Sequence, residues 1–514
     1  MTKHRAAPLA GAAMALAALL GQAGWAETQP ETPGAAEAAP APVEARGRNA
    51  YRPTHWLDDA EYLRWPLPAT AQEYARIDGF RIKDHIRALA AISRRSQAGG
   101  NQYWGRITGT QADRETTDWV ADQFRRIGLE RVRIQEFDLP PQWFPTSWEV
   151  LATDAGKRVV LGSAFPLFNS VGTAEIELEP VWVGTGTEAD FMGRDVKGRA
   201  VVAYGFPNPG GRTNTALTNG ILARADAAGA AALFVILGFP GNVKNIPQAG
   251  GSEPPARMPA FMLGNDDGLA LRRLIESGAA PRIRLRLATE SREGLKTASV
   301  WGVLPGKSDE TIAVMAHTDA FFEGAMDNGS GVGTLLELAE YYHGIPAEQR
   351  ARTMVFFTTS AHHAPSGERA GIRWIHNNMQ DMFRKTALIL NCEHTSQVQT
   401  YLMGNSLVAS NTVSARRWYV GGSERLKAIA VEAFREFGVA LYSEPERRPG
   451  GELSQVYRDA PGIHIIDHAI YHTDLDTPER VPEPGLEAAA RAFARIIDGA
   501  NKLPLDELRS DGAR

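Results

Sequence analysis

The sequence has only one cysteine, Cys392, among its 514 residues. A single cysteine excludes an internal disulfide, so stability must come from packing or from a bound metal. The chain also lacks a large net charge, because it has 55 basic and 60 acidic residues. It contains no run of Lys and Arg that would follow a phosphate backbone. We therefore expect no nucleic-acid partner.

Long apolar segments are scarce. One such run, residues 6–20, follows a basic start at residues 3–5 and precedes the small residues of Gly24-Trp25-Ala26. This order is typical of an export signal, and the run is shorter and richer in Ala than a membrane span of about 20 residues. We expect residues 1–26 to be a cleaved signal peptide and the mature protein to be periplasmic or extracellular, with no stable membrane span.

Composition and periodicity divide the rest of the chain into segments. Residues 27–50 are rich in Ala, Pro and Glu and cannot bury enough apolar surface to fold, which favours a disordered linker. Residues 151–293 are rich in β-type segments and hold no cluster of metal-type residues, which favours an inserted accessory domain. We expect the main domain to comprise residues 51–150 and 294–505, followed by a tail at 506–514.

Hydrophobic spacing predicts the main elements of these segments. We expect helices over 113–127, 216–228 and 332–342, and strands over 131–137, 179–183, 199–203, 231–237, 311–316, 353–359, 387–391 and 463–470. Strands and helices alternate after Ser299. The alternation predicts an α/β fold with a mostly parallel central sheet flanked by helices.

Metal-capable side chains follow the strand of 311–316. His317 and Asp319 stand directly after it, and Asp327-Asn-Gly-Ser-Gly331 opens the next helix. Ligands of open α/β sheets bind beyond the carboxyl ends of the strands, so this position suits a metal site. A helix cap with a glycine turn would also explain Asn328 and the glycines, but it would not explain His317 or Asp319.

Three further predicted strands end in the same kind of residue. His362 and His363 follow the strand of 353–359, Glu393 and His394 follow 387–391, and Tyr471 and His472 follow 463–470. Imidazole and carboxylate together suit zinc, and two metals that share one carboxylate would use about five or six such ligands. For His394 a structural role and a ligand role are equally open. We expect structural roles for His343, His376, His464 and His468, which match no motif position.

These motifs resemble a known family, the secreted dinuclear zinc peptidases that include leucyl-type aminopeptidases and glutamate carboxypeptidase. The resemblance rests on His317-Thr-Asp319, Asp327-Asn-Gly-Ser-Gly331, Glu393 after an Asn-containing strand, Tyr471-His472-Thr473, and Asp476-Thr-Pro-Glu479. It implies a zinc exopeptidase-like fold over almost the whole mature chain. Gly105-Arg-Ile-Thr-Gly-Thr110 is similar to the opening of the peptidase domain. Val196-Lys-Gly-Arg-Ala-Val201 and Gly229-Ala-Ala231 imply that residues 151–293 are a β-rich α+β protease-associated (PA) domain.

The resemblance also implies roles for individual residues around two zinc ions. The implied metal ligands are His317, Asp327 as the bridge, His363, Glu393 and His472. Asp319 would orient the imidazole of His317. The implied catalytic residues also include His362 as general base and Tyr471 as donor to the developing oxyanion.

The sequence departs from the family at the base and at one ligand. Where the family carries two adjacent glutamates, this chain has His362-His363. Neutral imidazole binds zinc well, and it can also accept a proton near neutral pH. A second alignment of this segment with the family places Glu368 at the position of the general base. The same alignment places Arg369 at the position of a metal ligand, where a positively charged side chain is unsuitable. Gly450-Gly451-Glu452 replaces a Ser-Asp-His segment that is frequent in relatives.

Together the observations predict an exported zinc-dependent metallopeptidase. The resemblance implies the activity of an aminopeptidase, a hydrolase of peptide bonds that acts through metal-activated water on a peptide or protein substrate. The alternatives are a catalytically inactive peptidase-like protein that binds peptides or proteins, or a hydrolase of another amide. The enzyme is favoured because His363 is itself a competent ligand.

Overall fold

The computed structural model describes residues 62–509, except 155–156, 208–214, 247–255, 279, 404–405 and 469. The predicted signal peptide and linker, and the last five residues of the tail, lie outside this part of the chain. All described residues belong to one compact unit. None of its described helices is both long enough and apolar enough to cross a bilayer.

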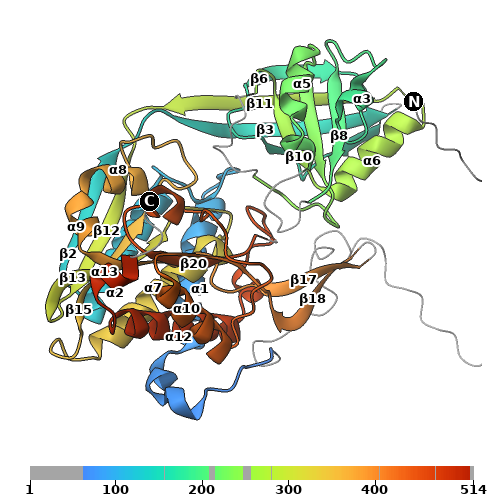
Figure 1. The fold of residues 1–514 in the computed structure, drawn as a ribbon. Coiled ribbons are helices and arrows are strands. Elements are labelled where there is room, and N and C mark those ends of the chain that lie inside the picture. The colour runs from blue at the N-terminus through green and yellow to red at the C-terminus, as the bar shows by residue number, and fades with distance from the viewer. Residues whose placement is uncertain are drawn as a thin grey trace, which may run out of the picture. The chain divides into compact units, whose positions relative to one another are not determined.

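A seven-stranded mixed sheet forms the centre of the main domain (Figure 1). Its strands, in spatial order, are β19 (Arg417–Gly421), β20 (Gly462–Ile466), β16 (Thr386–Asn391), β13 (Ser308–His317), β15 (Arg352–Thr359), β12 (Lys296–Leu304) and β2 (Glu130–Asp138). The four strands β20, β16, β13 and β15 run parallel to one another. The pairings toward both edges are antiparallel. The parallel strands therefore lie together in the middle of the sheet.

Helices cover both faces of this sheet, because alternate strand residues are apolar on each side. Ile312, Val314 and Phe356 face a core shared with α1 (Gly79–Ala98), α2 (Gln111–Ile127), α7 (Gly331–His343), α10 (Glu424–Glu436) and α12 (Glu483–Ala500). Ala313, Met315 and Phe357 face α8 (Gly371–Asn378), α9 (Gln380–Arg384) and α11 (Leu453–Val456). Figure 1 shows α8 and α9 across the sheet from α7. This layering confirms the predicted α/β fold.

Short elements complete the main domain. These are the 3₁₀-helices η3 (Ala69–Arg76) and η5 (Pro478–Arg480), the π-type turn η4 (Ala325–Ser330), α13 (Leu505–Arg509), the paired strands β1 (Gly105–Arg106) and β14 (Ala320–Phe321), and the hairpin β17 (Val398–Met403) and β18 (Ser406–Val413).

The β-rich segment between β2 and β12 builds two further sheets. One is antiparallel and consists of β4 (Lys157–Val160), β3 (Gln142–Asp154), β11 (Arg282–Arg292) and β6 (Thr173–Leu178). The other consists of β5 (Phe165–Pro166), β10 (Ala260–Leu263), β9 (Ala232–Leu237), β8 (Ala200–Gly205) and β7 (Pro180–Trp182), with α3 (Glu188–Phe191), α4 (Thr215–Thr218), α5 (Ile221–Ala227) and α6 (Asn265–Glu276). Because β3 and β11 pair along their length, the β-rich part includes residues 142–150 as well as the predicted 151–293.

Two predicted elements differ in length. The helix expected over 216–228 is split into α4 and α5, because Gly220 adopts a left-handed conformation with φ of 75° between them. The strand expected over 463–470 ends at Ile466. Asp467 ends it by accepting a hydrogen bond from the backbone of His468 with its own side chain, a local bond that competes with the strand ladder.

Candidate metal centre and active site

The loops after the four central parallel strands meet at one edge of the sheet. His317 is the last residue of β13, and the loops after β15, β16 and β20 carry His363, His394 and His472. Since parallel neighbours end on the same side, residues more than 150 positions apart in the sequence come together here.

Asp327 lies at the centre of this cluster. Its Oδ1 is 3.1 Å from Nε2 of His317 and 3.1 Å from Nε2 of His394. Its Oδ2 is 3.3 Å from Nε2 of His363 and 3.1 Å from Nε2 of His472. All five side chains are buried. One carboxylate oxygen thus faces each pair of imidazoles, as expected of a carboxylate that bridges two metal ions.

The ligand-capable atoms form two groups that share Asp327. In each group, His317–Asp327–His394 and Asp327–His363–His472, the atoms lie within 4.8 Å of one another. The Nε2 atoms of the four histidines and both oxygens of Asp327 are buried and have no hydrogen-bond partner within the described chain. Buried polar atoms without partners are costly, and a bound cation in each group would satisfy them. The residues therefore fit two metal ions.

Backbone carbonyls hold the other ring nitrogen of three of these histidines. A carbonyl only accepts, so Nδ1 carries a proton, and Nε2, which faces Asp327, is the nitrogen left to bind a metal. The pairs are His317 Nδ1 with Asp319 O at 3.1 Å, His472 Nδ1 with Ile246 O at 3.1 Å, and His394 Nδ1 with Asp467 O. The tautomer of each ring is thereby suited to metal binding through Nε2.

Charge and burial shift the pKa values of the cluster. Burial favours the protonated form of Asp327, but the imidazoles of His363, His394 and His317 hold its pKa well below the usual range. Burial and the nearby His363 lower the pKa of His472 to about 3, so its ring is neutral. Burial lowers the pKa of His363, but Asp327 and Asp319 outweigh it and raise the pKa to about 9. Without a cation, the cluster therefore keeps protons that a metal would displace.

Asp319 stabilises the loop that carries the His pair. Its carboxylate accepts hydrogen bonds from the backbone N–H of His362 at 3.2 Å, from that of His363 at 2.8 Å, and from the hydroxyl of Thr108 at 3.1 Å. Orientation of His317, the role expected for Asp319, is provided by its backbone carbonyl. The carboxylate itself lies 3.7 Å from Nδ1 of His317.

The loop that presents Asp327 is held by two polar side chains. The carboxylate of Asp476 accepts hydrogen bonds from the backbone N–H of Met326 at 2.6 Å and of Asp327 at 3.0 Å. The side chain of Asn328 accepts from Gly331 N–H at 3.1 Å and donates to the carbonyl of Cys392 at 3.0 Å. Asn328 therefore caps α7, as the alternative interpretation of this motif proposed, while Asp327 faces the histidines.

The first His of the pair, His362, lies beside the cluster and next to an acidic residue. Its ring stacks on that of His317 with centroids 4.2 Å apart and planes 13° apart. Its Nδ1 is 3.7 Å from Oε1 of Glu452. Glu452 is buried and accepts a hydrogen bond from the hydroxyl of Thr359. Sequence reasoning did not assign a role to Glu452, although the unusual Gly-Gly-Glu segment marked its position.

Glu393 and His394 both reach the group around His317. His394 supplies an atom to that group, whereas Oε1 of Glu393 lies 4.0 Å from Nε2 of His317 and its Oε2 accepts from Asn391 at 2.7 Å. Two ligands of one zinc, each about 2.1 Å from it, are at most about 4.2 Å apart, so Glu393 is also within range. Burial would raise the pKa of Glu393, but His362, His394 and His317 lower it to about 2.

The remaining candidates have less central positions. Tyr471 is buried and stacks on His472 with ring centroids 3.5 Å apart. Glu368, the base of the second alignment, is exposed and outside every group found in the described chain. His376 pairs with Asp459 at 2.6 Å, His468 contacts Arg417 at 2.8 Å, and His464 lies 3.9 Å from Glu446.

The region of the chain that contains the candidate metal centre matches a known family. Residues 299–497 match peptidase family M28. The matched M28 region contains β13, β15, β16, β20 and all the ligand-capable residues described above.

A curated relative and solved structures agree with this match. Aminopeptidase YwaD of Bacillus subtilis (strain 168) is 28% identical over 275 residues, which are 52% of this chain and 54% of YwaD. The match thus spans about half the length of that relative. The M28 peptidase precursor from Shewanella amazonensis SB2B has a TM-score of 0.64 at 15% identity, over 86% of this chain and 96% of the other. BSAP, a zinc aminopeptidase from Bacillus subtilis, has a TM-score of 0.57 at 17% identity, over 87% and 100%. The two structures share the fold of this chain.

Proposed function

We propose that the protein is an exported zinc-dependent metallopeptidase that acts as an aminopeptidase. The arrangement of Asp327 between two pairs of imidazoles supports this proposal most directly. The aminopeptidase names of a curated relative and of a solved structure with the same fold support the choice of reaction.

The proposed ligands divide between two zinc ions. His317, Asp327 and His394 would hold one ion, with Glu393 in range of it, and Asp327, His363 and His472 would hold the other. Zinc at such a site would polarise the scissile carbonyl and make water a stronger nucleophile at neutral pH.

His362 would act as the general base and acid that transfers the proton in this reaction. Its side chain is mostly buried, and its Nδ1 faces Glu452 at 3.7 Å. A carboxylate at that distance stabilises an imidazolium, so His362 could accept a proton from water and return it to the leaving amine. This pair would take the place of the family's glutamate base. Tyr471, stacked on His472, would donate its hydroxyl to the carbonyl oxygen.

Elemental analysis and a peptidase assay test the proposal together. Purified protein should contain two zinc ions per chain and hydrolyse amino-acid anilides. His362→Ala should lose at least about 100-fold in kcat, since a positioned base contributes 10²–10⁴-fold. His376→Ala is the matched control, because His376 pairs with Asp459 away from the centre. Bound metal without turnover in the wild type would contradict the enzyme and favour a peptide-binding protein.

Export requires its own test, because residues 1–26 lie outside the described chain. Full-length protein produced in a Gram-negative host should appear in the periplasmic extract with Glu27 as its first residue, as measured by mass spectrometry. Recovery of the intact amino terminus from the cytoplasm would contradict export.

A further inference from the structure

The loop that carries His472 packs against the β-rich segment. Ile470 and Leu475, which flank this histidine in the sequence, are 1% and 8% exposed and lie in the apolar core that β8, β9 and β10 form. Val243, in the loop after β9, belongs to the same core. The β-rich segment therefore anchors the chain on both sides of His472.

Hydrogen bonds join the loop of His472 to the loop after β9. The N–H of Ile246 donates to the carbonyl of His472 at 3.0 Å, and the N–H of Asp474 donates to the carbonyl of Lys244 at 3.1 Å. The carboxylate of Asp474 accepts from the N–H of Lys244 at 3.0 Å. The side chain of Asn245 donates to the carbonyl of His472 at 3.1 Å. The two loops thus form a short antiparallel bridge.

This bridge fixes both the ring and the backbone of His472. The ring donates from Nδ1 to the carbonyl of Ile246 at 3.1 Å, which leaves Nε2 to face Asp327. The backbone is left-handed, with φ of 55°, a conformation that a residue other than glycine keeps only where its surroundings hold it. The β-rich segment therefore orients one of the proposed metal ligands.

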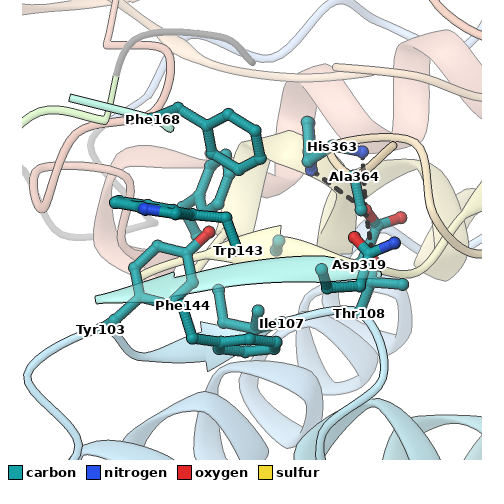
Figure 2. A pocket seen from close by; sticks show the side chains of 12 residues that line it. Tyr103, Ile107, Thr108, Trp143, Phe144, Phe168, Asp319, His363 and Ala364 are labelled. Atoms are coloured by element: carbon teal, nitrogen blue, oxygen red, sulfur yellow. Dashed lines mark hydrogen bonds and ion pairs between the residues drawn. The ribbon is translucent and has the colours of Figure 1, made fainter. Parts of the chain in front are cut away.

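The other histidines of the centre are held from within the main domain. The carboxylate of Asp319 accepts from the N–H of His363 at 2.8 Å, and Figure 2 shows the two residues next to each other. The ring acceptors of the group around His317, the carbonyls of Asp319 and Asp467, also belong to the main domain. Only the group of Asp327, His363 and His472 thus has ligands that two parts of the described chain position separately.

We propose that the β-rich segment controls the occupancy of the metal site formed by Asp327, His363 and His472, with Asn245 as a positioning residue. The proposal rests on the proposed function, because it assumes a centre with two metal ions. It gives the β-rich segment a role in the binding of one ion and none in the binding of the other. By linkage, a cation at this site should in turn stabilise the contact between the two loops.

Zinc titrations of proteins with one intact metal group test the role of Asn245. His317→Ala removes a ligand from the first group, and His472→Ala removes one from the second. Added to His317→Ala, the substitution Asn245→Ala should weaken zinc binding about 10-fold, at the lower end of the range for groups that orient a ligand. Added to His472→Ala, it should leave zinc affinity within about twofold. Isothermal titration calorimetry measures all four proteins.

Asn242→Ala is the matched control. Asn242 lies in the same loop, but its side chain exchanges hydrogen bonds with Asp267 of the β-rich segment, at 2.8 and 2.9 Å. Added to His317→Ala, Asn242→Ala should leave zinc affinity unchanged. Equal weakening by both asparagine substitutions would show a general loosening of the β-rich segment and would overturn the role of Asn245.

Hydrogen exchange measures the reciprocal effect without any variant of the first group. Zinc should slow amide exchange at Lys244 and Ile246 in the wild type, but not in His472→Ala. This measurement also decides the case in which His317→Ala does not fold. Exchange at these amides that zinc leaves unchanged in the wild type would overturn the coupling between the metal site and the β-rich segment.

The results distinguish failure of this proposal from failure of the proposed function. Wild-type protein that binds fewer than two zinc ions would contradict the centre with two metals, and this proposal with it. Two bound ions in the wild type, with equal zinc affinity in His317→Ala with and without Asn245→Ala, would overturn the role of Asn245 and leave the proposed function intact.

Discussion

At the scale of single residues, the centre depends on carboxylates that face imidazoles in a buried environment. Asp327 is 2% exposed and still ionised, because surrounding histidines outweigh the cost of burial. Glu452 is also 2% exposed and lies beside His362. Burial of an ionised carboxyl group costs free energy unless a positively charged or hydrogen-bonding group lies next to it.

Glu452→Gln should therefore affect turnover more than metal binding. The amide keeps the shape and can still accept from Thr359, but it cannot stabilise an imidazolium at His362. We expect kcat to fall about 10- to 100-fold with zinc content unchanged. Glu444→Gln, an exposed substitution in the same loop, should change neither quantity. An unaltered kcat in Glu452→Gln would exclude Glu452 from the mechanism.

A third buried carboxyl group, that of Asp113, should make the stability of the protein depend on pH. Burial raises the pKa of Asp113 to about 6, although Gly109, Thr297 and Ser360 donate hydrogen bonds to it. The folded state therefore binds this proton more tightly than the unfolded state, whose pKa is near 4. The resulting stabilisation is complete below pH 4 and is lost as pH rises to about 6.

Urea unfolding of the wild type and Asp113→Asn measures this effect. Between pH 4 and 7 the free energy of unfolding of the wild type should fall by about 2 kcal/mol relative to the variant. Asp122→Asn, an exposed substitution on the same helix, should follow the wild type. Parallel pH curves for wild type and Asp113→Asn would show that Asp113 has an ordinary pKa in the folded state.

At the scale of elements, the start of α7 lies directly against the end of β16. A Cβ added to Gly331 would lie 2.0 Å from the carbonyl oxygen of Cys392 and 2.3 Å from the side chain of Asn328. The close approach lets Asn328 connect the helix to the strand. The β-rich segment also contacts a loop of the centre. Asn245 forms a β-bridge with Thr473, and its side chain donates to the carbonyl of His472 at 3.1 Å.

Gly331→Ala should disturb the first of these contacts. The added methyl meets backbone that cannot move away freely, so the free energy of unfolding should fall by about 2 kcal/mol, and zinc affinity should fall with it. Chemical denaturation and equilibrium dialysis measure the two effects. Gly162→Ala places a methyl in open space and serves as the control. A Gly331→Ala protein as stable as the wild type would show that helix and strand can separate without cost.

At the scale of the whole molecule, metal binding should stabilise the fold. The proposed ligands come from loops after four strands of one sheet, and their inward atoms lack hydrogen bonds in the metal-free chain. A cation that binds only the folded state would shift the folding equilibrium by mass action.

Removal of metal with EDTA should lower the Tm by on the order of 5–10 °C, and zinc should restore it. Magnesium should not, because it prefers oxygen ligands and the site is rich in imidazole. Calorimetry of the metal-free, zinc-loaded and magnesium-treated protein makes the comparison. Identical Tm values in all three samples would contradict a metal site that connects these loops.

The sequence by itself determined the elements and the residue types at their ends. Apolar runs with the period of a strand predicted β13, β15 and β16 within one residue at each end, apart from the first three residues of β13, and His317 and His363 stood where these strands stop. The hydrophobic pattern did not predict two breaks. One is at Gly220, which splits a helix, and the other follows Ile466, where Asp467 ends the strand. Such breaks depend on single backbone conformations that periodicity does not encode.

Only the tertiary structure decided which side chains meet. Whether Glu393 or His394 faces Asp327 depends on one residue of register after β16, and the fold places His394 there with Glu393 beside it. Glu452 reaches His362 from 90 positions further along the chain. Sequence patterns report local periodicity, whereas these contacts arise from the order of strands in the sheet and from the close packing of its loops.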